Sequence, residues 1–128
     1  MKYILDTHTF IWAFDKPEEL STAAKNTLLK NGGNLYLSAA SVWEMAIKIC
    51  NNKLTLSLPL KSFVDTACKD LQCKILPIMI PHIMIVESLP LHHKEPFDRL
   101  IIAQSITTKY KILSKDEWFE SYGVQNIW

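Results

Sequence analysis

Short apolar runs alternate with longer helical patterns along this chain, and this alternation constrains the fold more than any other feature. Residues 2–5, 34–37, 74–76, 111–113 and 124–127 form the apolar runs, which are too short for helices and predict strands. Apolar residues recur at helical spacing in the segments between them, which are residues 7–14, 20–30, 41–50, 60–71, 80–89, 96–109 and 117–122. The sequence therefore predicts an α/β fold, with a twisted parallel sheet of about five short strands flanked by helices.

Length and composition predict one domain that spans residues 1–128. A chain of 128 residues with 48% hydrophobic and 21% charged residues can bury a single core and is not disordered. Its cysteines, Cys50, Cys68 and Cys73, are odd in number and form no CxxC pair. A disulfide scaffold and a zinc site are therefore not expected, and the thiols are interpreted as those of a cytosolic protein.

No segment is expected to enter a membrane. The most apolar stretch, residues 75–86, is interrupted by Pro77, Pro81 and His82 and is too short to span a bilayer. The N-terminus reaches Asp6 too early for a signal peptide. We therefore expect a soluble, cytoplasmic protein.

The charge balance gives no strong indication of nucleic-acid binding. The net charge is +1, and Arg99 is the only arginine. Proteins that hold nucleic acid by charge alone usually carry a basic face or a high pI. If the substrate is RNA, its phosphates must be met mainly by lysines, helix N-termini and bound cations.

Four acidic residues stand at predicted junctions between strands and helices. Asp6 ends the first strand, Glu44 and Asp98 fall in the first turns of predicted helices, and Asp116 follows the strand at residues 111–113. The carboxyl ends of parallel strands meet at one edge of a sheet, which is where such folds bind ligands. These four carboxylates are therefore candidates for one shared site.

Each of these acids taken alone has a simpler interpretation as a helix cap. Asp6 can cap the helix that follows it. Ser41 with Glu44 fits a capping box, and Ser114 followed by acidic residues fits the same pattern. Asp98 and Asp116 would also be favoured by the positive end of a helix.

Taken together, the four acids favour a metal site. Close carboxylates repel one another and need raised pKa values or bound cations. Oxygen ligands suit Mg²⁺ or Mn²⁺, and such cations can activate water for attack on a phosphodiester. The convergent arrangement therefore predicts phosphodiester hydrolysis.

Other polar and aromatic residues are weaker candidates. His92 and His93 are adjacent and point in different directions, so metal ligation by the pair is not favoured. His8 is a candidate for substrate contact, with capping or packing as the alternative. The four tryptophans are interpreted as core or interface residues rather than as platforms for stacked bases.

Motifs in a fixed order along the chain resemble those of the PIN-domain family (PilT N-terminus-like). The opening residues 4–9 (ILDTHT) are similar to the first motif, and residues 38–44 (SAASVWE) resemble the second motif of a bacterial subgroup. Residues 96–104 (PFDRLIIAQ) resemble the third motif. The fourth motif and the usual ending of the family are matched by residues 114–116 (SKD) and 122–124 (YGV).

This resemblance implies RNA cleavage that depends on Mg²⁺ or Mn²⁺, at a pocket built by Asp6, Glu44, Asp98 and Asp116. Lone PIN domains of this length are commonly the VapC-like toxin of a type II toxin–antitoxin pair. The resemblance thus also implies a homodimer and a small antitoxin that covers the active site.

Two positions depart from the family pattern. Glu95 stands where the subgroup usually has Asp, and Ser114 stands where Thr is more frequent. Neither change removes one of the four acids. Thr7, Ser38 and Arg99 are further candidates for holding phosphate or positioning the carboxylates, and Arg99 has a structural ion pair as its alternative.

Two other functions stay open at this point. The chain is alternatively a non-catalytic PIN-like protein-binding module, whose acids are helix caps or the remains of a decayed site. A structure-specific DNA nuclease is the second alternative, although the chain has no room for the insertions of its larger relatives.

Overall fold

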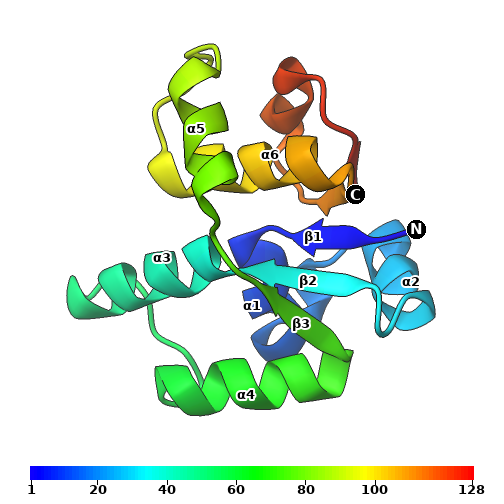
Figure 1. Ribbon diagram of the computed structural model, residues 1–128. Helices are drawn as coiled ribbons and strands as arrows, with labels where there is room; N and C mark the ends of the chain where they lie inside the picture. Colours follow the sequence, from blue (N-terminus) through cyan, green and yellow to red (C-terminus); the bar gives the residue numbers. More distant parts are fainter.

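Five parallel strands form one sheet at the centre of the fold, in a computed structural model that describes all 128 residues (Figure 1). The strands are β1 (Tyr3–Leu5), β2 (Leu35–Ser38), β3 (Cys73–Leu76), β4 (Lys111–Leu113) and β5 (Asn126–Ile127). Their order across the sheet is β3-β2-β1-β4-β5, and every neighbouring pair is parallel. The predicted α/β fold with a five-stranded parallel sheet is therefore confirmed.

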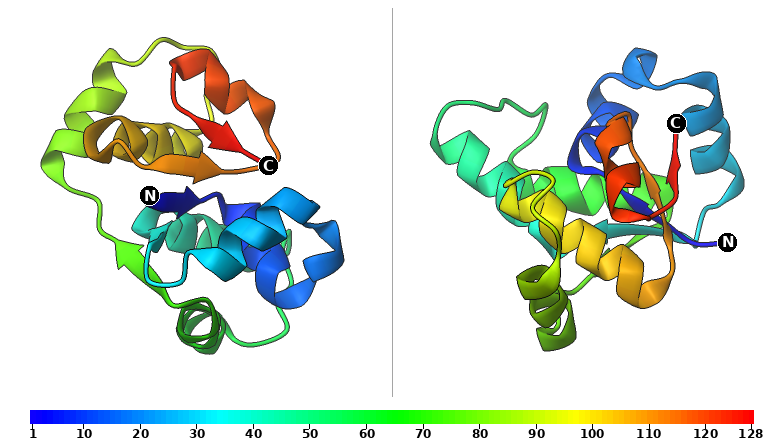
Figure 2. Two further views of the ribbon diagram at one scale, coloured as in Figure 1. Left: turned by 90° about the vertical axis from the view of Figure 1, so that its right-hand side faces the viewer. Right: turned by 90° about the horizontal axis from the view of Figure 1, so that it is seen from above.

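Helices cover both faces of this sheet (Figures 1 and 2). The α-helices are α1 (Thr7–Asp15), α2 (Thr22–Lys30), α3 (Ala39–Cys50), α4 (Leu60–Leu71), α5 (Ile80–Ser88) and α6 (Pro96–Thr108). Two 3₁₀ helices complete the chain, η1 (Pro17–Glu19) and η2 (Glu117–Tyr122). In Figure 1 the strands β1, β2 and β3 are spread from top to bottom, with α5 and α6 above them, α4 below β3 and α1 behind the sheet.

Burial on both faces of the central strand β1 explains why its apolar run is continuous in the sequence. Ile4 and Leu5 are both fully buried, although successive side chains of a strand point to opposite faces. Leu5 belongs to a large core with Phe10 and Phe63, and Ile4 belongs to a smaller core with Ile101. Both faces of β1 are therefore packed, as expected for a parallel sheet.

The order of the strands creates a switch point beside β1. The chain places β2 and then β3 on one side of β1, and it then crosses to β4 on the other side. In open α/β sheets, the carboxyl ends of the strands at such a reversal form the usual ligand-binding crevice. In Figure 1 this edge lies to the left, where α1 and α3 begin and close to the start of α6.

Local helix signals explain most of the boundaries, and two capping predictions were wrong. The α3 helix begins earlier than expected because Ser38, whose hydroxyl accepts from the Ala40 amide at 3.0 Å, is its N-cap. The capping box expected between Ser41 and Glu44 therefore does not form, and Glu44 lies in the second turn of the helix. Ser114 likewise caps no helix, because η2 begins after Asp116.

The apolar segment predicted to be helical at residues 80–89 forms the helix α5. Pro81 lies in the first turn of α5, and the Nδ1 atom of His82 accepts a hydrogen bond from the Met79 amide at 3.0 Å. The last strand is shorter than expected, and the helix η1 was not predicted. None of the helices has both the length and the apolar character needed to cross a bilayer.

Candidate functional site

Asp6 directly follows the central strand β1 at the switch point, and its two carboxylate oxygens make two different contacts. Its Oδ1 accepts from the Thr7 amide at 2.7 Å, so the residue caps α1 as the sequence indicated. Its Oδ2 accepts from the Ser114 hydroxyl at 2.8 Å, which ties the end of β1 to the end of β4. Only 4% of Asp6 is exposed, yet it lines a small open pocket with His8, Trp12, Lys115 and Asp116. A capping role and a role in a shared site are therefore compatible.

Glu44 reaches the same region from α3 and is held there by two partners. The Thr7 hydroxyl donates to Oε1 of Glu44 at 2.7 Å and lies 2.8 Å from the Ser41 hydroxyl. The Nζ of Lys48, one helical turn further on, lies 2.5 Å from Oε2 of Glu44. Thr7 thus positions a carboxylate of the site, which is one of the two roles that the sequence suggested for it.

The start of α6 brings Glu95 and Asp98 to Glu44. Oε1 of Glu95 accepts from the amides of Phe97 and Asp98 at 2.9 and 3.2 Å, so Glu95 is the N-cap of α6. Carboxylate oxygens of Glu44, Glu95 and Asp98 all lie within 4.8 Å of one another. Sequence reasoning noted Glu95 only as a departure from a motif. Its position just before a helix that begins with proline was the signal that it caps that helix.

Asp116 lies at the outer side of this region and is exposed to solvent. It follows β4 as predicted, and its amide donates to the Ser114 hydroxyl at 3.0 Å. Ser114 therefore contacts both Asp6 and Asp116. Serine here keeps the hydroxyl that these two contacts require, so the replacement of the more frequent threonine leaves this part of the site intact.

The pKa values show that the carboxylates act on one another. Burial and, to a smaller extent, the charge of Asp116 raise the pKa of Asp6 to about 6, against the opposing effects of Ser114, His8 and the Thr7 amide. Burial also raises the pKa of Asp98 to about 8, with added repulsion from the four other acids Asp6, Glu95, Glu44 and Asp116. The structure therefore brings all four predicted acids, together with Glu95, into one electrostatically coupled group.

The donor set of this group fits a divalent cation. Every side chain offers carboxylate oxygens, which suit Mg²⁺ and Mn²⁺, and the raised pKa of Asp98 means that positive charge beside it is favourable. Lys48 supplies one positive charge: burial lowers its pKa, but Glu44, Glu95 and Asp98 outweigh this and raise it overall. One lysine is too little to balance five carboxylates.

Arg99 does not contact this group, contrary to expectation. The residue is 7% exposed, and its guanidinium donates to the backbone carbonyls of Val86, Leu89, Pro90 and His93 and to the hydroxyl of Tyr122. The side chain thus holds the segment between α5 and α6 in place. A phosphate or a carboxylate partner would have to displace these bonds, so neither predicted role fits its position.

The remaining candidates also have defined positions. Ser38 is buried, and its hydroxyl is used as the N-cap of α3. The exposed ring of His8 lies against Trp12, with 5.6 Å between the ring centroids. Trp43 packs edge-on against Phe97 beside the acidic group and is 52% exposed, so it is a surface residue rather than a core residue.

Comparisons with known proteins identify the family and the fold of this chain. The PIN domain matches residues 3–125. Over 121 residues the chain is 26% identical to Ribonuclease VapC22 of Mycobacterium tuberculosis (strain ATCC 25618 / H37Rv), covering 93% of this chain and 90% of that protein. Its fold is similar to VapBC2 from Rickettsia felis bound to a promoter DNA fragment, with a TM-score of 0.76, 16% identity and coverage of 99% and 98%. It is also similar to a toxin-antitoxin complex from Klebsiella pneumoniae, with a TM-score of 0.67, 14% identity and coverage of 99% and 97%.

The chain therefore belongs to the PIN-domain family, as its motifs indicated. Within that family it is distantly related to the VapC ribonuclease toxins of VapBC toxin–antitoxin systems. PIN domains are typically metal-dependent nucleases that use a divalent cation, and the acidic group of Glu44, Glu95 and Asp98 is consistent with that chemistry.

Replacing Asp98 by Asn is expected to stabilise the metal-free protein near pH 8. Because the pKa of Asp98 is about 8 in the folded state and near 3.8 in an unfolded chain, the folded state binds the extra proton between these values. The free energy of unfolding therefore falls as the pH rises from about 4 to about 8. Asp98→Asn removes this loss, and it should raise the free energy of unfolding at pH 8 by about 1–3 kcal/mol. Urea unfolding in EDTA at several pH values measures the effect.

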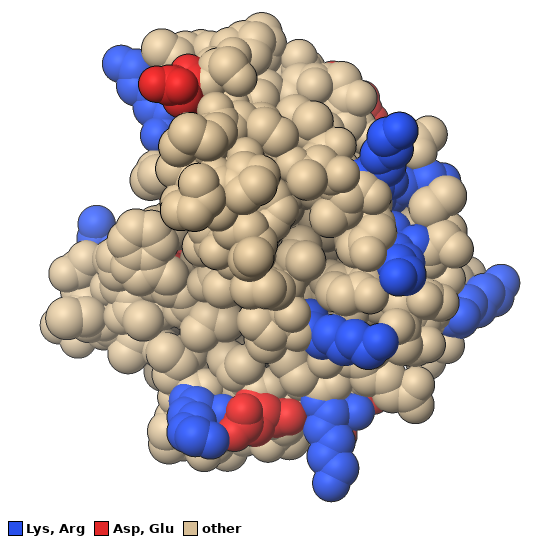
Figure 3. All heavy atoms as spheres, viewed as in Figure 1, with Lys and Arg blue, Asp and Glu red and all other residues tan.

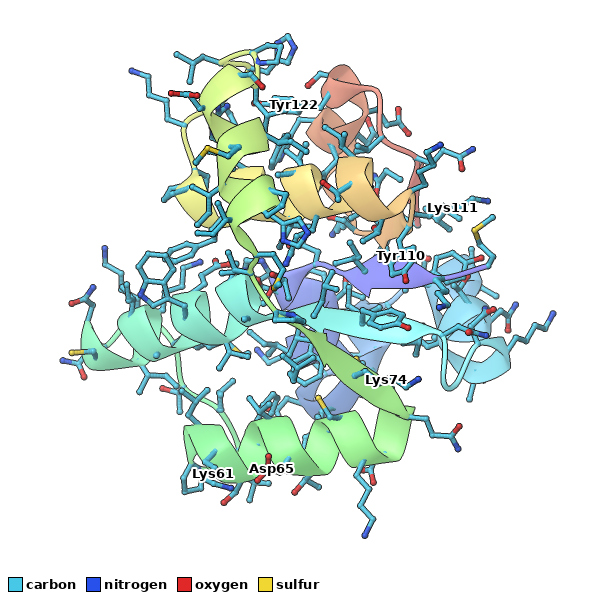
Figure 4. All side chains as sticks on the ribbon, viewed as in Figure 1. Lys61, Asp65, Lys74, Tyr110, Lys111 and Tyr122 are labelled. Atoms are coloured by element: carbon cyan, nitrogen blue, oxygen red, sulfur yellow. The ribbon has the colours of Figure 1, made fainter.

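The matched control for this measurement is Asp65→Asn. Asp65 is exposed on α4 and pairs with Lys61 at 2.7 Å, away from the acidic group (Figure 4). Its replacement should leave the pH dependence unchanged. Asp6, with a pKa of about 6, adds a slope of the same sign in both variants. An Asp98→Asn protein that is less stable than the wild type at pH 8 would contradict the assignment.

Proposed function

We propose that this chain is a metal-dependent endoribonuclease that hydrolyses RNA phosphodiester bonds, and that it is the toxin of a type II toxin–antitoxin pair. The observation that carries this proposal is the coupled group of carboxylates at the switch point of the sheet. Burial and the neighbouring acids raise the pKa of Asp98 to about 8, so the site is poised to bind positive charge. The distant relationship to VapC ribonucleases supports RNA as the substrate.

In this proposal Asp6, Asp98 and Asp116 hold one or two Mg²⁺ or Mn²⁺ ions, and Glu44 completes the ligand shell or orients the attacking water. The bound cation supplies activation of water and stabilisation of the charge that builds on the phosphate. The chain positions these groups through short hydrogen bonds: Ser114 orients Asp6, and Thr7 orients Glu44.

Lysines near the site are the proposed contacts to the RNA backbone. Lys115 is exposed next to Asp116, and its Nζ lies 5.9 Å from the centre of the Trp12 ring. Lys48 lies on the other side of the group, beside Glu44. Two separate positive groups at the rim fit a single strand that passes over the carboxylates, because its phosphates would meet a cation on each side.

Exposed apolar side chains support the proposal that this chain binds other proteins. Trp43 borders the acidic group with half of its surface exposed. On α5, Ile80, Ile83 and Met84 lie on one helix face at spacings of three and four residues, and all are exposed. Figure 3 shows a largely uncharged area over α5, although lysines line the right and lower parts of this face, and it shows a hollow at the left margin, between the α5–α6 layer and α3. Such surfaces usually mark interaction sites.

We assign these two surfaces to different partners. The small antitoxin would cover the acidic group and use Trp43 as an anchor, because that side chain packs against Phe97, which lies between Glu95 and Asp98 in the sequence. The exposed face of α5 would form a homodimer. Both assignments rest on the toxin–antitoxin proposal, with the fold similarity to a toxin-antitoxin complex as support.

Purified protein is expected to cleave single-stranded RNA with Mg²⁺ or Mn²⁺ and to lose cleavage in EDTA. Asp6→Asn and Asp98→Asn should each lower the rate at least about 100-fold, because replacing even a residue that only supports a metal ligand commonly costs 10–100-fold. The assay follows a fluorescent RNA and the matching DNA strand.

The surface variant Asp65→Asn is the control and should retain the wild-type rate. Cleavage of the DNA strand alone would favour the DNA-nuclease alternative. No cleavage of either strand under any condition would favour a non-catalytic binding module, and unchanged cleavage by Asp6→Asn would contradict the metal site.

Light scattering tests the assembly. The chain alone is expected to have about twice its mass of 14.7 kDa, and Ile83→Glu should reduce it to a monomer because the new charge would be buried in the interface. Addition of the product of a neighbouring short reading frame should give a larger complex that no longer cleaves RNA. Trp43→Ala should weaken this inhibition and leave the dimer intact. A monomeric wild type would overturn the assignment of α5.

A further inference from the structure

A network of polar groups connects the end of η2 to the first turn of α6. Tyr122, the last residue of η2, is labelled in Figure 4 beside the α5 and α6 layer. Its hydroxyl lies 2.9 Å from Nδ1 of His93, whose Nε2 faces Oδ2 of Asp98 at 3.8 Å. This network links a residue that sequence reasoning left without a role to one of the predicted metal ligands.

The hydrogen bonds of Tyr122 define which way its own proton points. The Tyr122 oxygen accepts from the backbone amide of His93 at 3.1 Å and from Nη1 of Arg99 at 3.3 Å. A phenol oxygen accepts at most two such bonds, and it has one proton to donate. The remaining neighbour, Nδ1 of His93, therefore receives that proton and acts as an acceptor.

A neutral imidazole carries one proton, so an accepting Nδ1 places it on Nε2. The hydrogen bond from Tyr122 to Nδ1 holds the ring in this orientation. The ring is also fixed by packing against Trp118, with 3.5 Å between the centroids. Nε2 is buried and has no hydrogen-bond partner, so its N–H is directed at Asp98 and is unused.

We propose that His93 is a positioning residue of the site: its Nε2–H, fixed by Tyr122, donates to Asp98 and orients that carboxylate toward a bound cation. The distance of 3.8 Å is longer than a hydrogen bond, and a small rotation of the Asp98 side chain closes it. Contacts of this kind are often long in an unliganded site and shorten on binding. This inference rests on the proposed metal-dependent function.

The same geometry excludes His93 itself as a metal ligand through Nε2. A ligating nitrogen needs a free lone pair, and the lone pair of Nε2 is absent in this tautomer because the atom carries the proton. Carboxylates that ligate a metal are usually held in turn by hydrogen bonds from groups that do not touch the ion, and these bonds fix the direction of the ligand. His93 does this for Asp98, while Tyr122 and Arg99 fix His93.

Nuclear magnetic resonance of the metal-free protein tests the first step. Long-range ¹⁵N–¹³C correlation of the labelled histidines reports which ring nitrogen carries the proton. We expect the Nε2–H form alone for His93 in the wild type, and a mixture of both forms in Tyr122→Phe, because the donor to Nδ1 is then missing. The control His92→Gln should leave the His93 signals unchanged. A His93 ring with its proton on Nδ1 would overturn the inference.

Calorimetric titration with Mn²⁺ tests the second step without RNA. His93→Phe keeps an aromatic ring against Trp118 but removes the donor, and it should weaken Mn²⁺ binding about 10–100-fold. His93→Gln places an amide N–H close to the former Nε2 and should restore most of the affinity. The control His92→Phe should bind Mn²⁺ as the wild type does. Equal affinities in His93→Phe and His93→Gln would show a purely structural role and overturn the inference.

The two proposals fail in different ways. If the tautomer and the Mn²⁺ affinities follow these expectations but no RNA is cleaved, the positioning role of His93 stands and the proposed ribonuclease function falls. If RNA is cleaved but His93→Phe binds Mn²⁺ and cleaves as the wild type does, the ribonuclease stands and the role of His93 falls.

Discussion

Repulsion between buried carboxylates is the interaction on which the rest of this site depends. Five acids converge where the strand order reverses beside β1, and burial and mutual repulsion raise the pKa values of Asp6 and Asp98. Such a group is stable only because the fold holds it in place. The hydroxyls of Thr7 and Ser114 bind two of the carboxylates, and Lys48 balances part of the charge. Much of the cost of gathering these charges is left for a cation to offset.

The fold and the convergence of four acids could be predicted from the sequence, because both follow from local patterns. Apolar runs too short for helices indicated the strands, and acids directly after those runs had to lie at one edge of a parallel sheet. The same local patterns misplaced two of the capping residues. A serine three residues before an acid fits a capping box, but Ser38 is the N-cap of α3, because β2 ends there and the helix begins at once. Helix caps therefore depended on where each strand ended, which the pattern gave only within a few residues.

Contacts between distant segments could not be predicted from the sequence. Arg99 was a candidate for holding phosphate or positioning the carboxylates, yet on a helix its side chain points about 100° away from that of its neighbour Asp98. Its side chain turns to the carbonyls between α5 and α6 instead. Tyr122 and His93 are 29 residues apart, and the packing of η2 against the loop before α6 brings them together. Glu95 joined the site through its role as a helix cap, which a motif comparison had treated as a substitution.

The central claim is that the carboxylate group gives up a proton to accept a divalent cation. Calorimetry of Mn²⁺ binding in buffers of different ionisation enthalpy measures the number of protons released. Because the pKa of Asp98 is about 8, its carboxyl is mostly protonated at neutral pH. The account predicts release of about one proton per chain near pH 7 and a decline toward none above about pH 9. Saturable binding with no release of protons at neutral pH, or no binding at all, would contradict it.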